Sequence, residues 1–297
     1  KMRSRKLARK TGLPILPGTD DAVANENAST KASELGFPLM VKAADGGGGI
    51  GIHIIESQEE LMPLIDRTRQ IAESAFGSSR LFFERYLKDA SHIEVQLIGD
   101  QHGNLVHLYE RDCSVQRRNQ KLVEESPAVK LSPKIRKKLC NLALKLGRHI
   151  GYSGAGTVEF LLADDEVYFM EMNTRVQVEH TITEQITGID IVREQLRIAS
   201  GLPLSYRQQD IAYRGYALQF RINAEDPKND FLPSFGRITH YYAPGGPGVR
   251  VDTAIYTGYE IPPYFDSMCL KLVVWGLTWE ETLNRGARAL NDMRVQG

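Results

Sequence analysis

The sequence predicts an α/β protein whose C-terminal part is rich in β-strands. Over the first two-thirds of the 297-residue chain, amphipathic helical runs alternate with short apolar runs typical of strands. After about residue 210, short strand-like runs separated by glycine and proline clusters dominate. A hydrophobic content of 42% and a charged content of 25% are ordinary for a globular protein and exclude general disorder.

Helix start and stop signals indicate where the helices lie. Ser57 and Thr278 are each followed three residues later by glutamate, which is the pattern of a capping box. Ser132 before a proline is typical of a helix start. The basic residues among the first ten predict a solvated helix face that ends at Gly12. The expected helices cover residues 1–10, 22–36, 133–150 and 189–200 and begin at 57 and 278.

Short runs of β-favouring residues predict the strands, and turn clusters separate them. The change of character at residues 203–213 predicts a boundary between two domains, residues 1–202 and 213–297. The expected strands cover residues 39–44, 52–55, 81–87, 92–98, 105–109, 215–223, 236–242, 249–254 and 269–275.

Charge and composition exclude several functional classes. The 37 basic and 37 acidic residues balance, so nothing in the overall charge favours nucleic acid or a membrane surface. No stretch approaches the roughly 20 apolar residues of a membrane-spanning helix. Three widely spaced cysteines, without metal or disulfide spacing, favour a reducing compartment such as the cytoplasm, with mitochondrial matrix or plastid left open. The start at Lys1, without a hydrophobic signal segment, suggests a piece of a longer protein.

A glycine run between two expected strands, residues 46–49, is the strongest local oddity. It is neither a Walker A loop nor a dinucleotide fingerprint, because a strand rather than a helix follows it. Consecutive glycines let backbone N–H groups approach a phosphate closely, and Lys42 could add a positive charge. The alternative is a flexible hairpin linker.

A predicted hairpin carries two acids. With a loop at 164–166, Glu159 faces Glu171 at about 5 Å, a repulsive pair among apolar neighbours. Such a pair favours a shared proton or a divalent cation, and Asn173 on the same face could add an oxygen ligand for Mg²⁺ or Mn²⁺. The alternative is a solvated hairpin face, and a register shift of one residue would separate the acids.

Beyond Glu171 every odd position up to Glu179 is polar. In an extended chain these side chains line one face. Arg175 could bind a small planar anion such as bicarbonate, and Glu179 could serve as a general base. The alternative is an amphipathic edge strand. Together, a phosphate loop, an acid pair and an anion-binding strand are the parts of an ATP-using site.

These motifs resemble the ATP-grasp superfamily and, within it, the biotin carboxylase component of biotin-dependent carboxylases. The resemblance covers essentially the whole chain and is most specific in the runs that end at His180 and Pro227. It implies an ATP-grasp fold with a lid subdomain at about residues 16–86 and a β-rich C-terminal domain. The motifs that carry it are residues 42–51, 83–87, 92–96, 110–118, 120–121, 171–180 and 221–227.

The resemblance implies a role for each matching position. The phosphate-binding residues would be Lys1, Lys42, Gly48 and Gly49, the adenine-binding residues Glu84, Arg85, Tyr86 and Leu87, and further nucleotide contacts His92 and Gln116. The metal ligands would be Glu159, Glu171 and Asn173. The bicarbonate site would comprise Lys121, Arg175, Gln177 and the backbone of Val178, with Glu179 as the base and Arg221 at the biotin end.

The implied reaction is the Mg²⁺- and ATP-dependent carboxylation of biotin by bicarbonate through carboxyphosphate. The implied partners are a biotin carboxyl carrier protein, a carboxyltransferase component and a second copy of the chain. Another bicarbonate-using ATP-grasp ligase, a catalytically weak fragment and a non-catalytic assembly domain remain alternatives. Taken singly, Lys121 could lie on a solvated surface, and His92 and Arg221 could be ordinary strand residues. Ile50, Asn119 and Leu270 depart from the family's usual residues.

Overall fold

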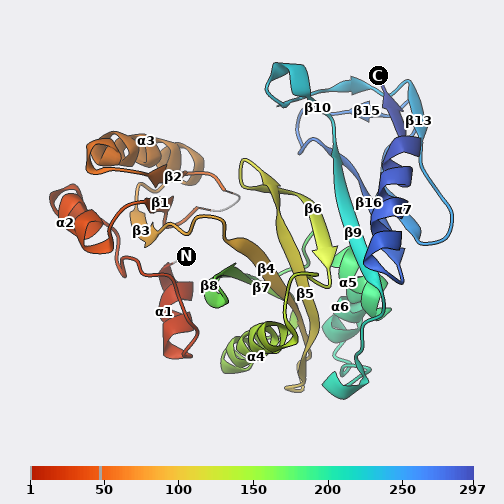
Figure 1. Cartoon of the computed structure of the whole chain (residues 1–297), viewed down its shortest axis with the longest axis horizontal. Helices are drawn as coiled ribbons and strands as arrows, with labels where there is room; N and C mark the ends of the chain where they lie inside the picture. The colour runs from red at the N-terminus through yellow and green to blue at the C-terminus, as the bar shows by residue number, and fades with distance from the viewer. Residues whose placement is uncertain (1, 47–48) are drawn as a thin grey trace.

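Two β-sheets of unequal size organise the chain (Figure 1). The computed structural model describes residues 2–46 and 49–297. The large sheet has eight strands in the order β14-β16-β9-β6-β5-β4-β7-β8, and every neighbouring pair is antiparallel. Its strands are β4 (Ser91–Gly99), β5 (Leu105–Arg117), β6 (Gln120–Ser126), β7 (Gly154–Ala163), β8 (Glu166–Asn173), β9 (Tyr216–Asn223), β14 (Val249–Thr253) and β16 (Met268–Gly276).

The small sheet lies apart from the large one in Figure 1 and has its own core. Its strands, in the order β2-β1-β3, are β1 (Leu39–Ala43), β2 (Ile52–Ile55) and β3 (Leu81–Arg85). The helices α2 (Asn25–Leu35) and α3 (Gln58–Phe76) pack on it through buried side chains such as Leu61 and Ile65. This unit occupies the range expected for a lid, and its role as a lid stays a prediction.

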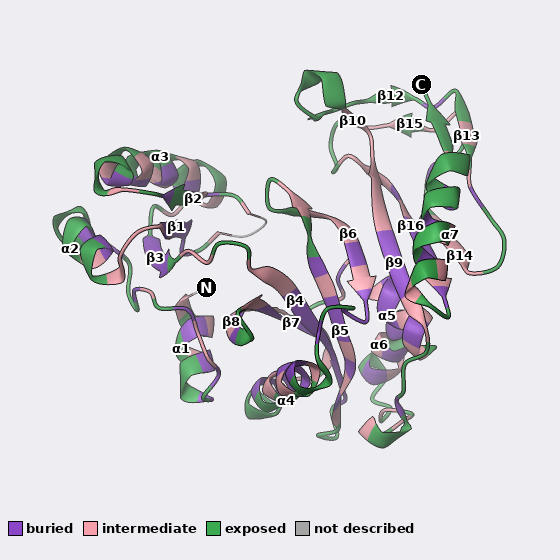
Figure 2. Cartoon of the chain, in the orientation of Figure 1, coloured by how far each residue is buried: buried purple, intermediate pink, exposed green. Residues whose placement is uncertain are grey.

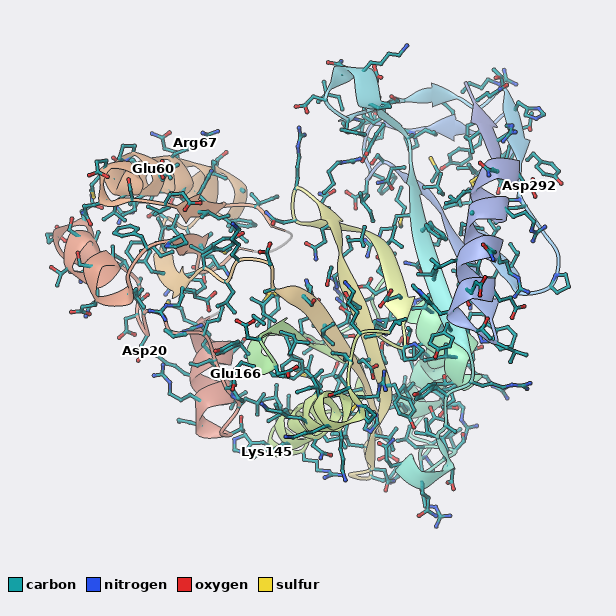
Figure 3. The ribbon with its side chains drawn as sticks, viewed as in Figure 1. Asp20, Glu60, Arg67, Lys145, Glu166 and Asp292 are labelled. Atoms are coloured by element: carbon teal, nitrogen blue, oxygen red, sulfur yellow. The ribbon has the colours of Figure 1, made fainter. Side chains whose placement is uncertain are left out.

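Helices cover both faces of the large sheet. Leu97 packs toward α4 (Pro133–His149), whereas its neighbour Ile98 packs toward α6 (Ile191–Ala199), as alternation along a strand requires. The helix α7 (Trp279–Asp292) covers β16 and β9. Figure 2 shows the resulting buried band along the middle strands and exposed outer faces on the helices, and Figure 3 shows side chains filling the space between these layers.

Short elements complete the chain. The helices α1 (Met2–Lys10) and α5 (His180–Thr187) border the large sheet, with 3₁₀ turns at Gln208–Asp210 and Pro227–Asn229. Three two-stranded ribbons lie in the C-terminal part: β10 (Glu225–Asp226) with β11 (Leu232–Pro233), β12 (Gly236–Arg237) with β15 (Glu260–Ile261), and β13 (His240–Tyr242) with β17 (Arg294–Gln296).

Most of the predicted helices and strands are confirmed, but the capping boxes form only in part. Ser132 and Thr278 accept hydrogen bonds from the amides three residues later, at 3.3 and 3.2 Å. The hydroxyl of Ser57 makes no such bond, and Glu60 caps the amide of Glu56 instead. Helix α5 was not predicted at all, because the polar alternation up to Glu179 was interpreted as extended chain.

The sheet continues across the predicted domain boundary. Strand β6, before residues 203–213, pairs directly with β9, after them. The division into two domains therefore stays a prediction. In the part of the chain that the structure describes, none of the helices combines the length and apolar character needed to cross a bilayer.

Candidate active site

Lys121 on β6 is the centre of a buried ionic cluster. Its ammonium group donates to carboxylate oxygens of Glu94 at 2.6 Å, Glu159 at 3.1 Å and Glu179 at 2.6 Å. An ammonium group has three N–H donors, so each of the three carboxylates can accept a hydrogen bond from one of them. Burial lowers the pKa of Lys121, but the three carboxylates, Glu94 first, outweigh burial and raise it above its ordinary value. The solvated-surface alternative for Lys121 is therefore wrong.

Arg111, which the sequence analysis assigned no role, holds Glu94 in place. Its guanidinium is fully buried and donates from Nε to Glu94 Oε1 at 2.5 Å. The terminal nitrogens donate to Gln96 at 2.8 Å, Thr183 at 2.9 Å and Thr157 at 3.2 Å. These partners come from β4, β7 and α5. Sequence spacing gives no signal for such a set, because the fold alone brings its members together.

Glu179 reaches the cluster from a helix start, not from a strand. The chain leaves β8 at Asn173, and Glu179 is the N-cap residue of α5. The predicted extended run over 173–179 is therefore wrong, since the loop and the helix break the alternation. Glu179 nevertheless lies in the cluster, where its second oxygen accepts from Arg221 Nη2 at 3.0 Å. The alternative of an ordinary strand residue at Arg221 is also wrong, since Arg221 bridges two buried carboxylates.

The acid pair of the hairpin is confirmed, although its loop is not. Glu159 lies directly opposite Glu171, as predicted. The loop is Asp164-Asp165, with both residues at positive φ, rather than residues 164–166. The shorter loop shifts the register by one residue, and a bulge between Glu159 and Phe160 restores it. The one-residue shift from the shorter loop and the one-residue bulge therefore cancel, and Glu159 still faces Glu171.

The donors around Glu159 keep it ionised. Its Oε1 accepts from Lys121, from Asn173 Nδ2 at 3.0 Å and from Gln177 Nε2 at 2.9 Å. Burial raises the pKa of Glu159, but the hydrogen bond from His92 and the charge of Lys121 more than offset it and lower the pKa. An ionised carboxylate beside a second carboxylate and an amide is an oxygen-rich donor set that fits Mg²⁺ or Mn²⁺.

His92 joins the cluster in a defined tautomer. The Gln116 amide donates to the Cys113 carbonyl at 2.8 Å and lies 3.0 Å from His92 Nδ1, so Nδ1 is the acceptor. Its proton is therefore on Nε2, which donates to Glu159 Oε2 at 3.1 Å. The two residues expected to contact nucleotide thus lie in one chain of hydrogen bonds with an expected metal ligand.

A second ionic cluster joins α1 to the small sheet. Lys42 Nζ donates to Glu84 Oε2 at 2.6 Å, and Arg5 pairs with Glu84 Oε1. Arg5 also donates to the Leu16 carbonyl at 2.9 Å and is only 3% exposed. The prediction of a fully solvated basic face on the first helix is therefore wrong at Arg5. Two expected nucleotide-binding residues, Lys42 and Glu84, do lie together.

The other expected site residues lie outside these clusters. Arg175 is exposed and donates to the neighbouring Val176 carbonyl at 3.1 Å, while the Val178 carbonyl accepts from Lys271 at 3.3 Å. Arg85 donates to the Leu35 carbonyl at 3.1 Å. Gly49 has a φ of 78°. Lys1 and Gly48 lie outside the described residues, while Tyr86 and Leu87 follow β3 in the connection to β4.

The departures at residues 50, 119 and 270 have different surroundings. Leu270 is buried in the C-terminal core, where it lies opposite Thr253 and Ile222 in the sheet. Ile50 is half exposed, and Asn119 lies at the turn between β5 and β6. A Cβ atom on Gly49 would lie 3.3 Å from the Asn119 side chain, so the glycine turn contacts this hairpin closely.

Comparison with known proteins shows the family of this chain. The family model described as "Carbamoyl-phosphate synthase L chain, ATP binding domain" matches residues 1–207, and the model "Biotin carboxylase C-terminal domain" matches residues 219–297. The chain belongs to the biotin carboxylase family. The biotin carboxylase 1 of Bacillus subtilis is 47% identical over the whole chain, which covers 68% of that protein. The biotin carboxylase of Haemophilus influenzae is 46% identical, again over the whole chain, with 66% of its length covered.

Solved biotin carboxylases share the fold. The biotin carboxylase domain dimer of Hydrogenobacter thermophilus 2-oxoglutarate carboxylase, in complex with MgADP, ADP and bicarbonate, superposes with a TM-score of 0.98 at 47% identity. The Campylobacter jejuni biotin carboxylase has a TM-score of 0.96 at 43% identity. Each comparison covers this whole chain and 66% of the other. The fold is thus the ATP-grasp fold of biotin carboxylases, and the chain spans about two-thirds of its relatives' length.

Proposed function

We propose that this chain carries the site for ATP-dependent carboxylation of biotin by bicarbonate, the first half-reaction of a biotin-dependent carboxylase. The observation that carries the proposal is the meeting of Lys121, Glu179 and Arg221 in one buried cluster. A base, an ammonium group and a guanidinium at hydrogen-bond distance are the groups that bicarbonate activation requires.

Glu179 is the proposed base. Both of its oxygens accept from cations, at 2.6 Å from Lys121 and 3.0 Å from Arg221, and it is 2% exposed. These two contacts hold the carboxylate of Glu179 in a fixed position beside both cations. Bicarbonate entering beside Glu179 takes over one of these donors. Arg175 is exposed and, among the residues that the structure describes, donates to one backbone carbonyl, so it can turn toward the same anion.

The deprotonated bicarbonate oxygen attacks the γ-phosphorus of ATP to give carboxyphosphate and ADP. Carboxyphosphate then carboxylates N1′ of biotin, and the released phosphate takes up the N1′ proton, with Arg175 stabilising the biotin enolate and Arg221 at the biotin end. Gln177 and the Val178 backbone complete the proposed anion site.

Glu159, Glu171 and Asn173 would hold Mg²⁺ or Mn²⁺, which neutralises phosphate charge when bound. Lys42 and Gly49, with Lys1 and Gly48, would contact the phosphates. Residues 84–87 with His92 and Gln116 would hold the remaining nucleotide. Because an ammonium group has three donors, Lys42 can contact phosphate while it keeps its 2.6 Å bond to Glu84.

Biotin would arrive on a carrier protein, and a carboxyltransferase component would consume the product. A dimer, as in the Hydrogenobacter thermophilus domain, and a cytoplasmic location are part of the proposal. A carbamoyl-phosphate-type ligase is a second candidate, because the first family model bears that description. The match of residues 219–297 to a biotin carboxylase domain favours biotin.

The test measures ADP release by the intact protein with Mg-ATP and bicarbonate, with and without free biotin. We expect biotin-stimulated, bicarbonate-dependent release that falls by about a hundredfold or more in Lys121→Met and Arg175→Ala. Arg193→Ala, an exposed arginine on α6, is the matched control and should behave as the unaltered protein. Bicarbonate-dependent release that ignores biotin would support the carbamoyl-phosphate-type ligase, and no release from a folded protein would support a non-catalytic role.

A further inference from the structure

Glu124 is a buried acid that Arg221 links to the proposed base Glu179, and it has no role in the function proposed above. It follows Lys121 by three residues on β6, and its side chain is fully buried. In a regular strand residues three apart face opposite sides. Here the pairing of β6 with β5 shifts between Lys121 and Val123, and this irregularity lets both side chains reach the same cluster.

Both oxygens of Glu124 are used, one of them by Arg221. Arg221 Nε donates to Glu124 Oε1 at 2.6 Å, and Gln219 Nε2 donates to Oε2 at 2.9 Å. Gln219 is itself fixed by the hydroxyl of Thr181 at 2.5 Å. Glu124 is therefore anchored from β9 and α5, and it can act as a rigid support for the guanidinium.

Arg221 spans two carboxylates with different tasks. Nε points to Glu124, while Nη2 points to Glu179 at 3.0 Å. Among residues 2–46 and 49–297, no group accepts a hydrogen bond from Nη1 of Arg221, so this nitrogen is available to a ligand. Because a guanidinium is planar, the bond at Nε sets the direction of both terminal nitrogens.

We propose that Glu124 is a positioning residue that keeps Arg221 directed at the biotin end of the site while Glu179 acts as the base. The inference rests on the proposed function, because it assigns Arg221 to biotin. When Glu179 takes a proton it loses charge, and its bond to Nη2 weakens. Glu124 is then the remaining charged anchor of Arg221. Without it, the long side chain loses the orientation that its rigid Nε contact provides.

The electrostatics support this geometry. Burial, helped by the charge of Glu179 and opposed by Arg221 and the hydrogen bond from Gln219, raises the pKa of Glu124 to about 7. Below this pH, Glu124 is neutral and its bond to Arg221 is weaker. The charged groups that face it are Arg221 and Glu179, and Lys121 lies beyond Glu179. A purely structural acid gives no reason for the apparent KM for biotin to follow this titration.

The test compares Glu124→Gln with Glu125→Gln in the intact protein. Glutamine keeps the shape and removes the charge, and Gln219 can turn its amide to face the new donor. Glu125 is the neighbouring residue on β6, bonds to the Val129 amide at 3.1 Å and also has a pKa raised, to about 6, so it is a matched control outside the cluster. Glu124→Asp retains the charge and should therefore raise the KM for free biotin less than Glu124→Gln does.

We expect Glu124→Gln to raise the KM for free biotin by about tenfold, the loss of one charge-assisted hydrogen bond. Bicarbonate-dependent ADP release without biotin should fall by a smaller factor, because Lys121 still holds Glu179 at 2.6 Å. The apparent KM of the unaltered protein should rise as the pH falls through about 7, and this dependence should be absent from the variant.

An unchanged KM for biotin, or an equal loss of every kinetic parameter, overturns the proposal. If even the unaltered protein ignores biotin, the proposed function has failed instead. In that case a crystal structure of Glu124→Gln decides the positioning role: a displaced Arg221 guanidinium supports it, and an unmoved one overturns it.

Discussion

Replacing Lys121 by methionine tests whether the ammonium group holds the cluster together. The change removes the cation that lies 2.6–3.1 Å from three carboxylates, each at most 4% exposed. Removing one partner of a buried ion pair costs about 3–5 kcal/mol, because the charges left behind are uncompensated. An unfolding entropy of about 2.1 cal/mol/K per residue gives about 0.6 kcal/mol/K for this chain, so Tm should fall by about 5–8 °C.

The stability of Lys121→Met should depend on pH. Without Lys121, the buried carboxylates repel one another, and the pKa values of Glu94 and Glu159 in the folded protein rise. A raised carboxyl pKa makes the folded state less stable as pH rises through it, so the variant should recover stability as the pH falls. In the unaltered protein the Lys121 contribution persists down to pH 5, because the pKa of Lys121 is raised and those of Glu94 and Glu159 are lowered.

The assay is thermal unfolding between pH 8 and pH 5, beside Lys130→Met, an exposed lysine just beyond β6, as control. We expect the Tm gap between Lys121→Met and the unaltered protein to narrow as the pH falls. Mg²⁺ should raise the Tm of the variant more than that of the unaltered protein, because a divalent ion replaces the missing charge. A gap that is absent or equal at all pH values would refute this reasoning.

Three further perturbations test other parts of the molecule. Glu171→Gln should raise the Mg²⁺ concentration needed for half-maximal ADP release by about tenfold or more, whereas Glu166→Gln at the exposed start of β8 (labelled in Figure 3) should not. Gly215→Ala should lower the free energy of unfolding by about 1–3 kcal/mol, because φ is 71° and the new Cβ would lie 2.3 Å from the Gly276 carbonyl oxygen. The measurement is urea unfolding, and an unchanged midpoint contradicts this expectation. Burial lowers the pKa of His107 to about 4, so stability should fall by up to about 1.4 kcal/mol per pH unit as the pH drops from 6.5 toward 4. His107→Asn should reduce this slope, and an unaltered slope would assign the acid sensitivity elsewhere.

Local patterns predicted the elements and part of the site. Hydrophobic spacing and end signals gave most helices and strands, because they depend on neighbours in the chain. The facing of Glu159 and Glu171 was also predicted, since a hairpin couples two adjacent strands. That success depended on a bulge whose position the sequence did not indicate.

The rest of the site depends on contacts between distant segments. Arg111 gathers partners from positions 94 to 183, and Arg5 reaches Glu84 across 79 residues. A basic residue on a helix is usually solvated, and only the docking of α1 near the small sheet explains why Arg5 is buried. The run over 173–179 was misassigned for a related reason: alternation of period two also fits a loop whose side chains turn inward one by one.

The charges of the cluster indicate what completes it. Among the described residues, the ion pairs of the cluster join three cations to four carboxylates, a formal balance of minus one: Lys121, Arg111 and Arg221 with Glu94, Glu124, Glu159 and Glu179. A buried excess of negative charge is costly unless a cation offsets it. Under the proposed function, a divalent ion held by Glu159, Glu171 and Asn173 would offset this charge, and the raised pKa of Glu124 offsets part of it as well. Metal binding should therefore lower the pKa of Glu124 and strengthen its hydrogen bond with Arg221. Binding of the ion at the expected metal ligands would then favour the orientation of Arg221 at the biotin end.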